Sequence, residues 1–142
     1  MKEIVNRLFE LINEEELNYE DLAKKLGLSD VSIIYTWKRE EYLPSTEMFI
    51  KLSELFNCSL DYLFARTDDF GVCGNKKISN FYSRLEEIIK KHKIKKCILQ
   101  EEKICSSNNL FKWRNGAVPK VETLIKLADY FGVTIDYLLG RE

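Results

Sequence analysis

Apolar residues recur along this chain at the three- and four-residue spacing of amphipathic α-helices. The alternating pattern of a β-strand does not occur anywhere in the sequence. The spacing therefore predicts an all-α protein built from short helices. The first five are predicted over residues 2–13, 19–26, 30–39, from Ser45 or Thr46 to Phe56, and 60–64. The second five are predicted near residues 84–89, 95–102, 107–114, 121–131 and 135–139.

Polar residues and glycine mark where these helices begin and end. Asn, Ser and Thr side chains accept hydrogen bonds from the free amides of a first helical turn, and glycine ends helices because it readily takes a positive φ. Gly27 is accordingly predicted to end the second helix. The predicted N-caps are Asn18, Ser29, Ser45 or Thr46, Ser59 and Ser106.

The predicted helices form two copies of one pattern. Pro44 and Pro119 open two blocks at a constant offset of 75 residues, and nine positions after these prolines are identical. The offset is 77 in the first helices and 76 at Trp37 and Trp113, so the second copy is one residue shorter at each of two places. Such self-similarity indicates an internal repeat.

The repeat predicts two tandem five-helix domains, residues 1–66 and residues 78–142, joined by a connector of residues 67–77. Domains of about 65 residues are small, but many of that size fold alone. The connector contains Asp68-Asp69 and Gly74-Asn75, which favour turns.

Within each copy, the second and third helices are short and joined by a tight turn, as in a helix-turn-helix. An α-helix fits the major groove of B-DNA, and residues near its N-terminus reach the base edges. The preceding helix crosses the DNA backbone, where its N-terminal amides meet phosphates. The arrangement therefore indicates DNA binding.

Two stretches resemble the Cro/lambda-repressor-like helix-turn-helix family, also called the XRE family. The first is Leu22-Ala23-Lys24-Lys25-Leu26-Gly27-Leu28-Ser29 followed by Trp37. The second is Trp113-Arg114-Asn115-Gly116-Ala117-Val118-Pro119 followed by Asp136-Tyr137-Leu138-Leu139-Gly140. The resemblance covers nearly all of the chain outside the connector. It implies a sequence-specific transcriptional regulator of double-stranded DNA, commonly a dimeric repressor from a bacterial phage or mobile element.

The resemblance also implies which side chains contact DNA, because Asn pairs with adenine and Lys donates to guanine. The candidates for bases in the second domain are Ser107, Asn108, Asn109 and Lys112. The candidates for phosphates are Lys95, Lys96, Arg114, Asn115 and Lys120. The matching surface of the first domain comprises Asp30, Val31, Ser32, Tyr35 and Thr36, with Lys38 and Arg39 behind it.

Each domain departs from the family pattern in its own place. The first has Glu40-Glu41 where the turn normally carries glycine, and Asp30 leads its third helix with a charge that repels phosphate. The second has Gln100-Glu101-Glu102-Lys103 in place of the usual Leu-Ala and glycine pattern of the second helix. The sequence therefore allows two alignments of this helix with its counterpart in the first domain, one residue apart.

The net charge of −1 hides an asymmetry between the two halves. Residues 1–70 contain 8 Lys and Arg against 15 Asp and Glu, a net of −7, whereas residues 71–142 contain 14 against 8, a net of +6. The basic run of residues 90–96 is either a contribution to DNA binding or a solvated helix end. The acidic residues 1–21 form either a solvated face or a docking site for a protein partner.

Other chemistry finds little support in the sequence. The four cysteines form no CxxC pair and the single histidine, His92, has no evident nucleophile beside it, so no metal, cofactor or enzymatic activity is expected. Cys58 aligns with Val133 and is expected in the core, whereas Cys73 is expected to be exposed. No stretch reaches the roughly 18 apolar residues of a membrane span and none resembles a signal peptide, so a cytoplasmic location is expected.

Three functional hypotheses follow from these patterns. In the first, both domains bind one asymmetric site, and a single chain mimics the usual homodimer with recognition helices roughly 34 Å apart. In the second, the basic domain binds DNA while the acidic domain serves oligomerisation or binds another protein. In the third, the protein keeps the fold but no longer binds DNA, and it acts as a protein-interaction module, such as an antirepressor.

Overall fold

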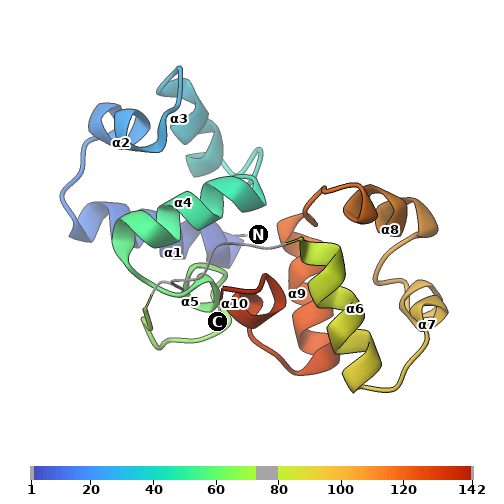
Figure 1. The fold of residues 1–142 in the computed structure, drawn as a ribbon. Helices are drawn as coiled ribbons and strands as arrows, with labels where there is room; N and C mark the ends of the chain where they lie inside the picture. The colour runs from blue at the N-terminus through green and yellow to red at the C-terminus, as the bar shows by residue number, and fades with distance from the viewer. Residues whose placement is uncertain (1, 73–79, 142) are drawn as a thin grey trace. The chain divides into compact units, whose positions relative to one another are not determined.

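The computed structural model describes residues 2–72 and 80–141, and within them every regular element is an α-helix. The chain divides into two compact units, domain 1 (Met1–Cys73) and domain 2 (Gly74–Glu142). Domain 1 contains α1 (Lys2–Glu14), α2 (Tyr19–Leu26), α3 (Ser32–Lys38), α4 (Thr46–Phe56) and α5 (Leu60–Leu63) (Figure 1). Domain 2 contains α6 (Phe81–Lys91), α7 (Lys96–Glu101), α8 (Ser107–Arg114), α9 (Val121–Phe131) and α10 (Ile135–Leu138). The prediction of two tandem five-helix domains is confirmed.

Local hydrogen bonds explain most of the helix boundaries. The Asn18 side chain accepts a hydrogen bond from the Asp21 amide at 2.7 Å and starts α2, while Gly27 ends that helix with φ 74°. Ser45 and Ser59 start α4 and α5 in the same way. These caps were predicted from the sequence because each is a polar residue directly before an apolar-periodic segment.

The start of α3 differs from the expectation. The helix begins at Ser32 rather than Asp30, and Ser29 is not its cap. The Asp30 carboxylate instead accepts a hydrogen bond from the Ser32 amide at 3.0 Å, and Val31 takes the N-cap position without a side-chain bond. Asp bonds readily to the backbone two residues on, so it displaced the serine predicted for this role.

The core of each domain contains one tryptophan from the third helix of that domain. Trp37 and Trp113 are only 4% and 3% exposed, which confirms their predicted place in the core. In domain 2 the Trp113 ring meets Phe81 of α6 edge to face at 5.5 Å between ring centres. Cys58 is fully buried, as expected from its alignment with a core valine. Cys73, for which exposure was expected, lies outside the described residues.

A shared contact joins the first helix of each domain to the last. In domain 1 the Arg7 guanidinium lies 4.2 Å from the centre of the Tyr62 ring and donates a hydrogen bond to the Tyr62 carbonyl. In domain 2 Arg84 lies 4.3 Å from the centre of the Tyr137 ring and donates to the Tyr137 carbonyl at 3.0 Å. The final turns are closed by two ion pairs, Asp61 with Arg66 and Asp136 with Arg141. The repeated Asp-Tyr motif therefore serves packing in both domains.

Backbone conformation shows where the two copies differ in length. Five residues of domain 1 with a positive φ have a counterpart with a positive φ in domain 2. The pairs are Glu16 and Lys93, Gly27 and Lys103, Glu40 and Gly116, Asn57 and Gly132, and Ala65 and Gly140. Their offsets fall from 77 to 76 across the second helix and from 76 to 75 before the fourth. The pairs therefore align α7 with α2. Lys103 takes the left-handed conformation in domain 2 that Gly27 takes in domain 1.

The first residues of the predicted connector pack against domain 1. Arg7 donates a hydrogen bond to the Thr67 carbonyl at 3.0 Å and pairs with Asp68 at 3.1 Å. The Phe70 carbonyl accepts from the Ser59 amide at 3.0 Å, and the Phe70 ring contacts Tyr62. Among the described residues, no helix is long and apolar enough to cross a bilayer.

Candidate nucleic-acid interface

The helix pair α7–α8 of domain 2 holds most of the residues predicted to contact DNA. A capping box fixes the start of α8: the Ser106 hydroxyl accepts from the Asn109 amide at 3.1 Å, and the Asn109 side-chain oxygen accepts from the Ser106 amide at 3.0 Å. Trp113 anchors the other end of α8 in the core, and α8 packs on α6. The helix is thus held at both ends.

This anchoring leaves one face of α8 open to solvent. Ser107, Asn108 and Lys112 are exposed, as expected for side chains that reach base edges. Asn109 differs, because its side-chain oxygen is occupied within the capping box and the residue is half-buried. The structure therefore gives Asn109 a role in holding the first turn of α8.

The end of α8 carries two further predicted residues. Arg114 is exposed, and Asn115 follows it, with its side-chain amide donating to the Phe111 carbonyl at 2.9 Å. Gly116 then takes φ 101°, and nothing lies within 4 Å of a Cβ placed there, so the backbone rather than crowding requires glycine at this turn. Lys120 is exposed at the N-cap of α9.

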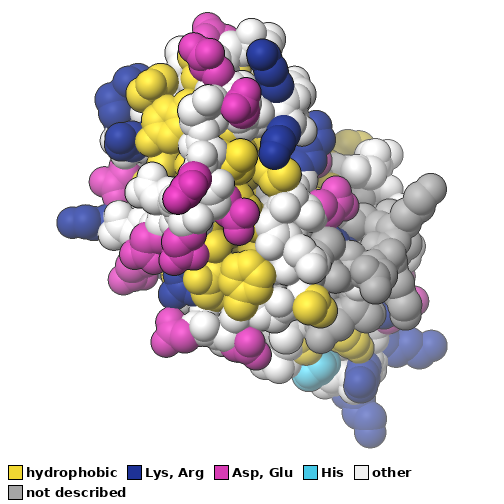
Figure 2. All heavy atoms as spheres, turned by 90° about the vertical axis from the view of Figure 1, so that its left-hand side faces the viewer, with side chains coloured by type: hydrophobic (Ala, Val, Ile, Leu, Met, Phe, Trp, Pro, Cys, Tyr) yellow, Lys and Arg dark blue, Asp and Glu magenta, His cyan; other side chains and the backbone are white. Residues whose placement is uncertain are grey.

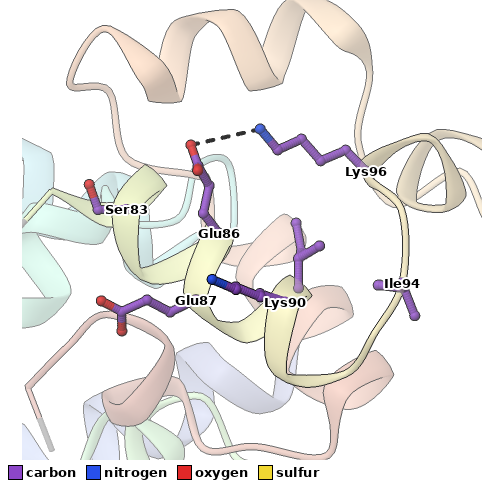
Figure 3. A pocket seen from close by; sticks show the side chains of 7 residues that line it. Ser83, Glu86, Glu87, Lys90, Ile94 and Lys96 are labelled. Atoms are coloured by element: carbon purple, nitrogen blue, oxygen red, sulfur yellow. Dashed lines mark ion pairs between the residues drawn. The ribbon is translucent and has the colours of Figure 1, made fainter.

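Lys95 and Lys96 lie at the start of α7. Lys95 is exposed and takes the N-cap position of α7 without a side-chain hydrogen bond. The Lys96 ammonium donates to the Tyr82 hydroxyl at 2.6 Å and lies 3.7 Å from a Glu86 carboxylate oxygen, across the hollow shown in Figure 3. The hydrogen bond to Tyr82 raises the pKa of Lys96 above its usual value, so this lysine is fully charged at neutral pH.

On the corresponding surface of domain 1, more of the predicted side chains are engaged in contacts within the domain. Tyr35 is 44% exposed and its ring packs edge to face on Tyr19 at 5.1 Å. The Thr36 hydroxyl donates back to the Ser32 carbonyl at 3.1 Å, so it is engaged within α3. Lys38 is exposed, with its ammonium 5.6 Å from the centre of the Tyr19 ring.

Several acidic groups lie on the helix-turn-helix pair of domain 1. Hydrogen bonds from Ser32, chiefly from its backbone amide, lower the pKa of the exposed Asp30 carboxyl, so it stays ionised. Glu20 and Asp21 stand in the first turn of α2, and Arg39 is paired with Glu41 at 2.8 Å. This half of the predicted site therefore mixes acidic groups with the exposed Lys24, Lys25 and Lys38.

Helix N-termini show the same contrast. In domain 1 the starts of α2 and α4 are capped by Asn18 and Ser45. In domain 2 the equivalent helices α7 and α9 start at Lys95 and Lys120, which provide no side-chain cap. Positive charge therefore takes the place of a capping oxygen at two turns of domain 2.

One exposed residue of α8 was not among the predicted contacts. Phe111 is 67% exposed and lies on the same face as Asn108 and Lys112. An apolar residue in a helix is normally assigned to the core, which is why sequence reasoning missed it. The signal was present in the spacing, since Trp113 and Leu110 define the inward face and Phe111 falls outside it.

Two short helices joined by a tight turn, with the second anchored by a buried tryptophan, occur in each domain and define a tandem helix-turn-helix protein. Comparison with protein families agrees: residues 8–63 match the family described as helix-turn-helix, and residues 84–142 match the Cro/C1-type HTH DNA-binding domain. Both domains therefore belong to helix-turn-helix families, and domain 2 belongs to the Cro/C1-type DNA-binding family. No curated protein and no solved structure matches the chain significantly.

Proposed function

We propose that the protein is a sequence-specific transcriptional repressor that reads double-stranded DNA with domain 2. The observation that carries this proposal is the open face of α8, where Asn108 and Lys112 stand exposed on a helix fixed at both ends. Lysines and an arginine surround this face at Lys95, Lys96, Arg114 and Lys120. An exposed polar helix with a basic border suits the major groove and its flanking phosphates.

The residues divide into two roles in this proposal. Asn108 pairs with adenine and Lys112 donates to guanine, while Ser107 bonds to an adjacent base edge. Lys95, Lys120 and Arg114 contact phosphates, and Lys96 exchanges its bond with Glu86 for one with a phosphate. These cationic contacts position the helix and make the affinity depend on salt.

Domain 1 serves a different role in the same proposal, as a surface for oligomerisation or for a protein partner. Its α2–α3 pair carries the ionised Asp30 in the turn before α3, and Glu20 and Asp21 in the first turn of α2. Tyr42 is 70% exposed on the same domain. Figure 2 shows a face of the molecule on which Asp and Glu side chains, with some Lys and Arg, border exposed apolar side chains. Such a surface suits a basic protein partner better than DNA.

The first test is selection of genomic fragments by the purified protein, followed by affinity measurements across salt concentration. The proposal expects one enriched site and an affinity that falls steeply with salt. If the selected site lies in a promoter, the protein is expected to lower the expression of a reporter gene placed downstream of that promoter. No enrichment and no salt dependence would favour the protein-interaction module and its antirepressor role.

Matched substitutions separate the two domains. Asn108→Ala and Lys112→Ala are each expected to weaken binding to the selected site by about tenfold or more, the effect of losing one base contact. Their counterparts in domain 1, Ser32→Ala and Tyr35→Ala, are expected to leave it unchanged. Equal losses from both pairs would instead support a single chain that reads one asymmetric site with both domains.

A further inference from the structure

Phe111 stands out among the aromatic residues of domain 2. It is 67% exposed, whereas Phe81, Trp113 and Phe131 are 3%, 3% and 6% exposed. Within the described part of the chain, no other aromatic ring packs against it. The fold gains little from this side chain, because most of it is exposed and it is not among the buried core residues.

The position of Phe111 on α8 is specific. Helical spacing places it one turn from both Ser107 and Asn108, at the middle of the open face, with Lys112 on the far side of Asn108. Its equivalent in domain 1 is Tyr35, whose ring is instead held against Tyr19 at 5.1 Å. The aromatic group that packs locally in domain 1 is therefore free to meet a ligand in domain 2.

The chemistry of the DNA bases gives this ring one matching feature. In the major groove, A, G and C present hydrogen-bonding groups, whereas thymine adds an apolar C5-methyl group. A single apolar ring between Ser107 and Asn108 complements a methyl group that lies among donors and acceptors. The surrounding polar side chains make the same surface a poor core for a protein–protein contact, which requires contiguous apolar area.

We propose that Phe111 is a specificity-determining residue that packs on the C5-methyl group of a thymine in the DNA site. This inference rests on the proposed function, since it requires α8 to lie in the major groove. It adds a base identity: the site contains a thymine next to the base read by Asn108.

The test removes the methyl group from the DNA and the ring from the protein in turn. Each thymine of the selected site is replaced singly by deoxyuridine, which lacks only the methyl, and affinities are measured by fluorescence anisotropy. For the unmodified protein, one such replacement is expected to weaken binding about fourfold, the factor for one buried methyl group. Phe111→Ala should weaken binding to the thymine site and should bind thymine and uracil equally at that position.

Controls separate the possible failures. Tyr35→Ala should retain the full preference for thymine, and circular dichroism should show Phe111→Ala to be folded with an unchanged unfolding midpoint. Binding that ignores every thymine methyl, or a preference that survives in Phe111→Ala, would overturn this inference while leaving DNA binding intact. A change of oligomeric state in Phe111→Ala would reassign the ring to a protein contact. Absence of any DNA binding by the unmodified protein would instead overturn the proposed function itself.

Discussion

The two helix-turn-helix pairs of this chain have the same fold but differ in how their first helices are packed, capped and charged. α2 buries Leu22, Ala23 and Leu26 and starts at a side-chain cap, whereas α7 buries only Leu99 and starts at Lys95 without one. α2 carries Glu20 and Asp21 in its first turn and Lys24 and Lys25 in its last, whereas α7 starts at Lys95 and Lys96 and ends at Glu101. The pair whose first helix buries more residues is thus the one with acidic residues in the first turn of that helix. The family pattern in α2 reflects packing rather than DNA contact. Leu22 and Ala23 are buried in the core, and Gly27 forms the turn that ends the helix.

The largest expected effect comes from removing the tryptophan that anchors each pair. Trp113→Ala and Trp37→Ala should each destabilise their own domain by about 3–5 kcal/mol, the cost of deleting a buried large side chain. Domains of this size have a total stability near about 5 kcal/mol, so each variant largely unfolds one domain. If domain 2 alone reads DNA, only Trp113→Ala abolishes binding.

Thermal denaturation followed by circular dichroism, together with DNA binding, tests this pair of variants. Trp113→Phe and Trp37→Phe serve as milder controls that keep an aromatic ring in each core. Loss of binding in Trp37→Ala equal to that in Trp113→Ala would show that domain 1 takes part in the complex. The two domains would then form two halves of one DNA interface.

A smaller effect is expected at the left-handed residue that ends the second helix. Gly27→Lys should lower the stability of domain 1 by about 1 kcal/mol, because an L-residue with φ near 74° is strained by about that amount. Lys103→Gly should stabilise domain 2 by about 0.5 kcal/mol, since relief of strain exceeds the extra freedom glycine gives the unfolded chain. Denaturant titration of the two variants measures both shifts, and a loss of stability in Lys103→Gly would refute the alignment of these two turns.

The helix caps offer a way to exchange the properties of the two pairs. Lys95→Asn gives α7 the cap residue of α2 and should stabilise domain 2 by about 1 kcal/mol. It also removes a proposed phosphate contact, so the slope of log affinity against log salt should become shallower by about 1. Asn18→Ala is the matched control, expected to destabilise domain 1 by about 1 kcal/mol without changing the salt slope. A Lys95→Asn protein with an unchanged slope would remove Lys95 from the interface.

Sequence reasoning predicted the features that are set locally. The bounds of α8 and α9, the caps Asn18 and Ser106, and the division into two five-helix domains all depend on residues within a few positions of one another. Competition between neighbours was harder to foresee: Ser29 and Asp30 both suit the start of α3, and only the folded chain shows that Asp30 bonds to the Ser32 amide.

The site was less predictable than the fold, because exposure depends on tertiary packing. Asn109 and Asn108 are the same residue type, yet Asn109 is taken up by the capping box and Asn108 is open. Phe111 was passed over because an apolar residue type suggests the core. Lys103 carries no sequence sign of its positive φ, which only the comparison of the two domains reveals.

The last prediction uses the cysteines as reporters of the same comparison. Cys97 is exposed on α7, Cys105 is buried just before α8, and Cys58 is fully buried in domain 1. Burial raises the pKa of the Cys105 thiol, so at pH 8 it has less of the reactive thiolate than an ordinary cysteine. In a Cys73→Ser background, iodoacetamide should modify Cys97 first, and raising the pH should speed the reaction of Cys105 until its elevated pKa is passed.

DNA makes this labelling a map of the interface. Addition of the selected site should slow modification of Cys97, because α7 would lie along the DNA backbone, while the slow reaction of Cys58 should not change. Mass spectrometry of tryptic peptides measures each rate separately, and an unselected DNA of equal length controls for non-specific contacts. Protection of Cys58 without protection of Cys97 would place the DNA on domain 1 and reverse the assignment of the two helix-turn-helix pairs.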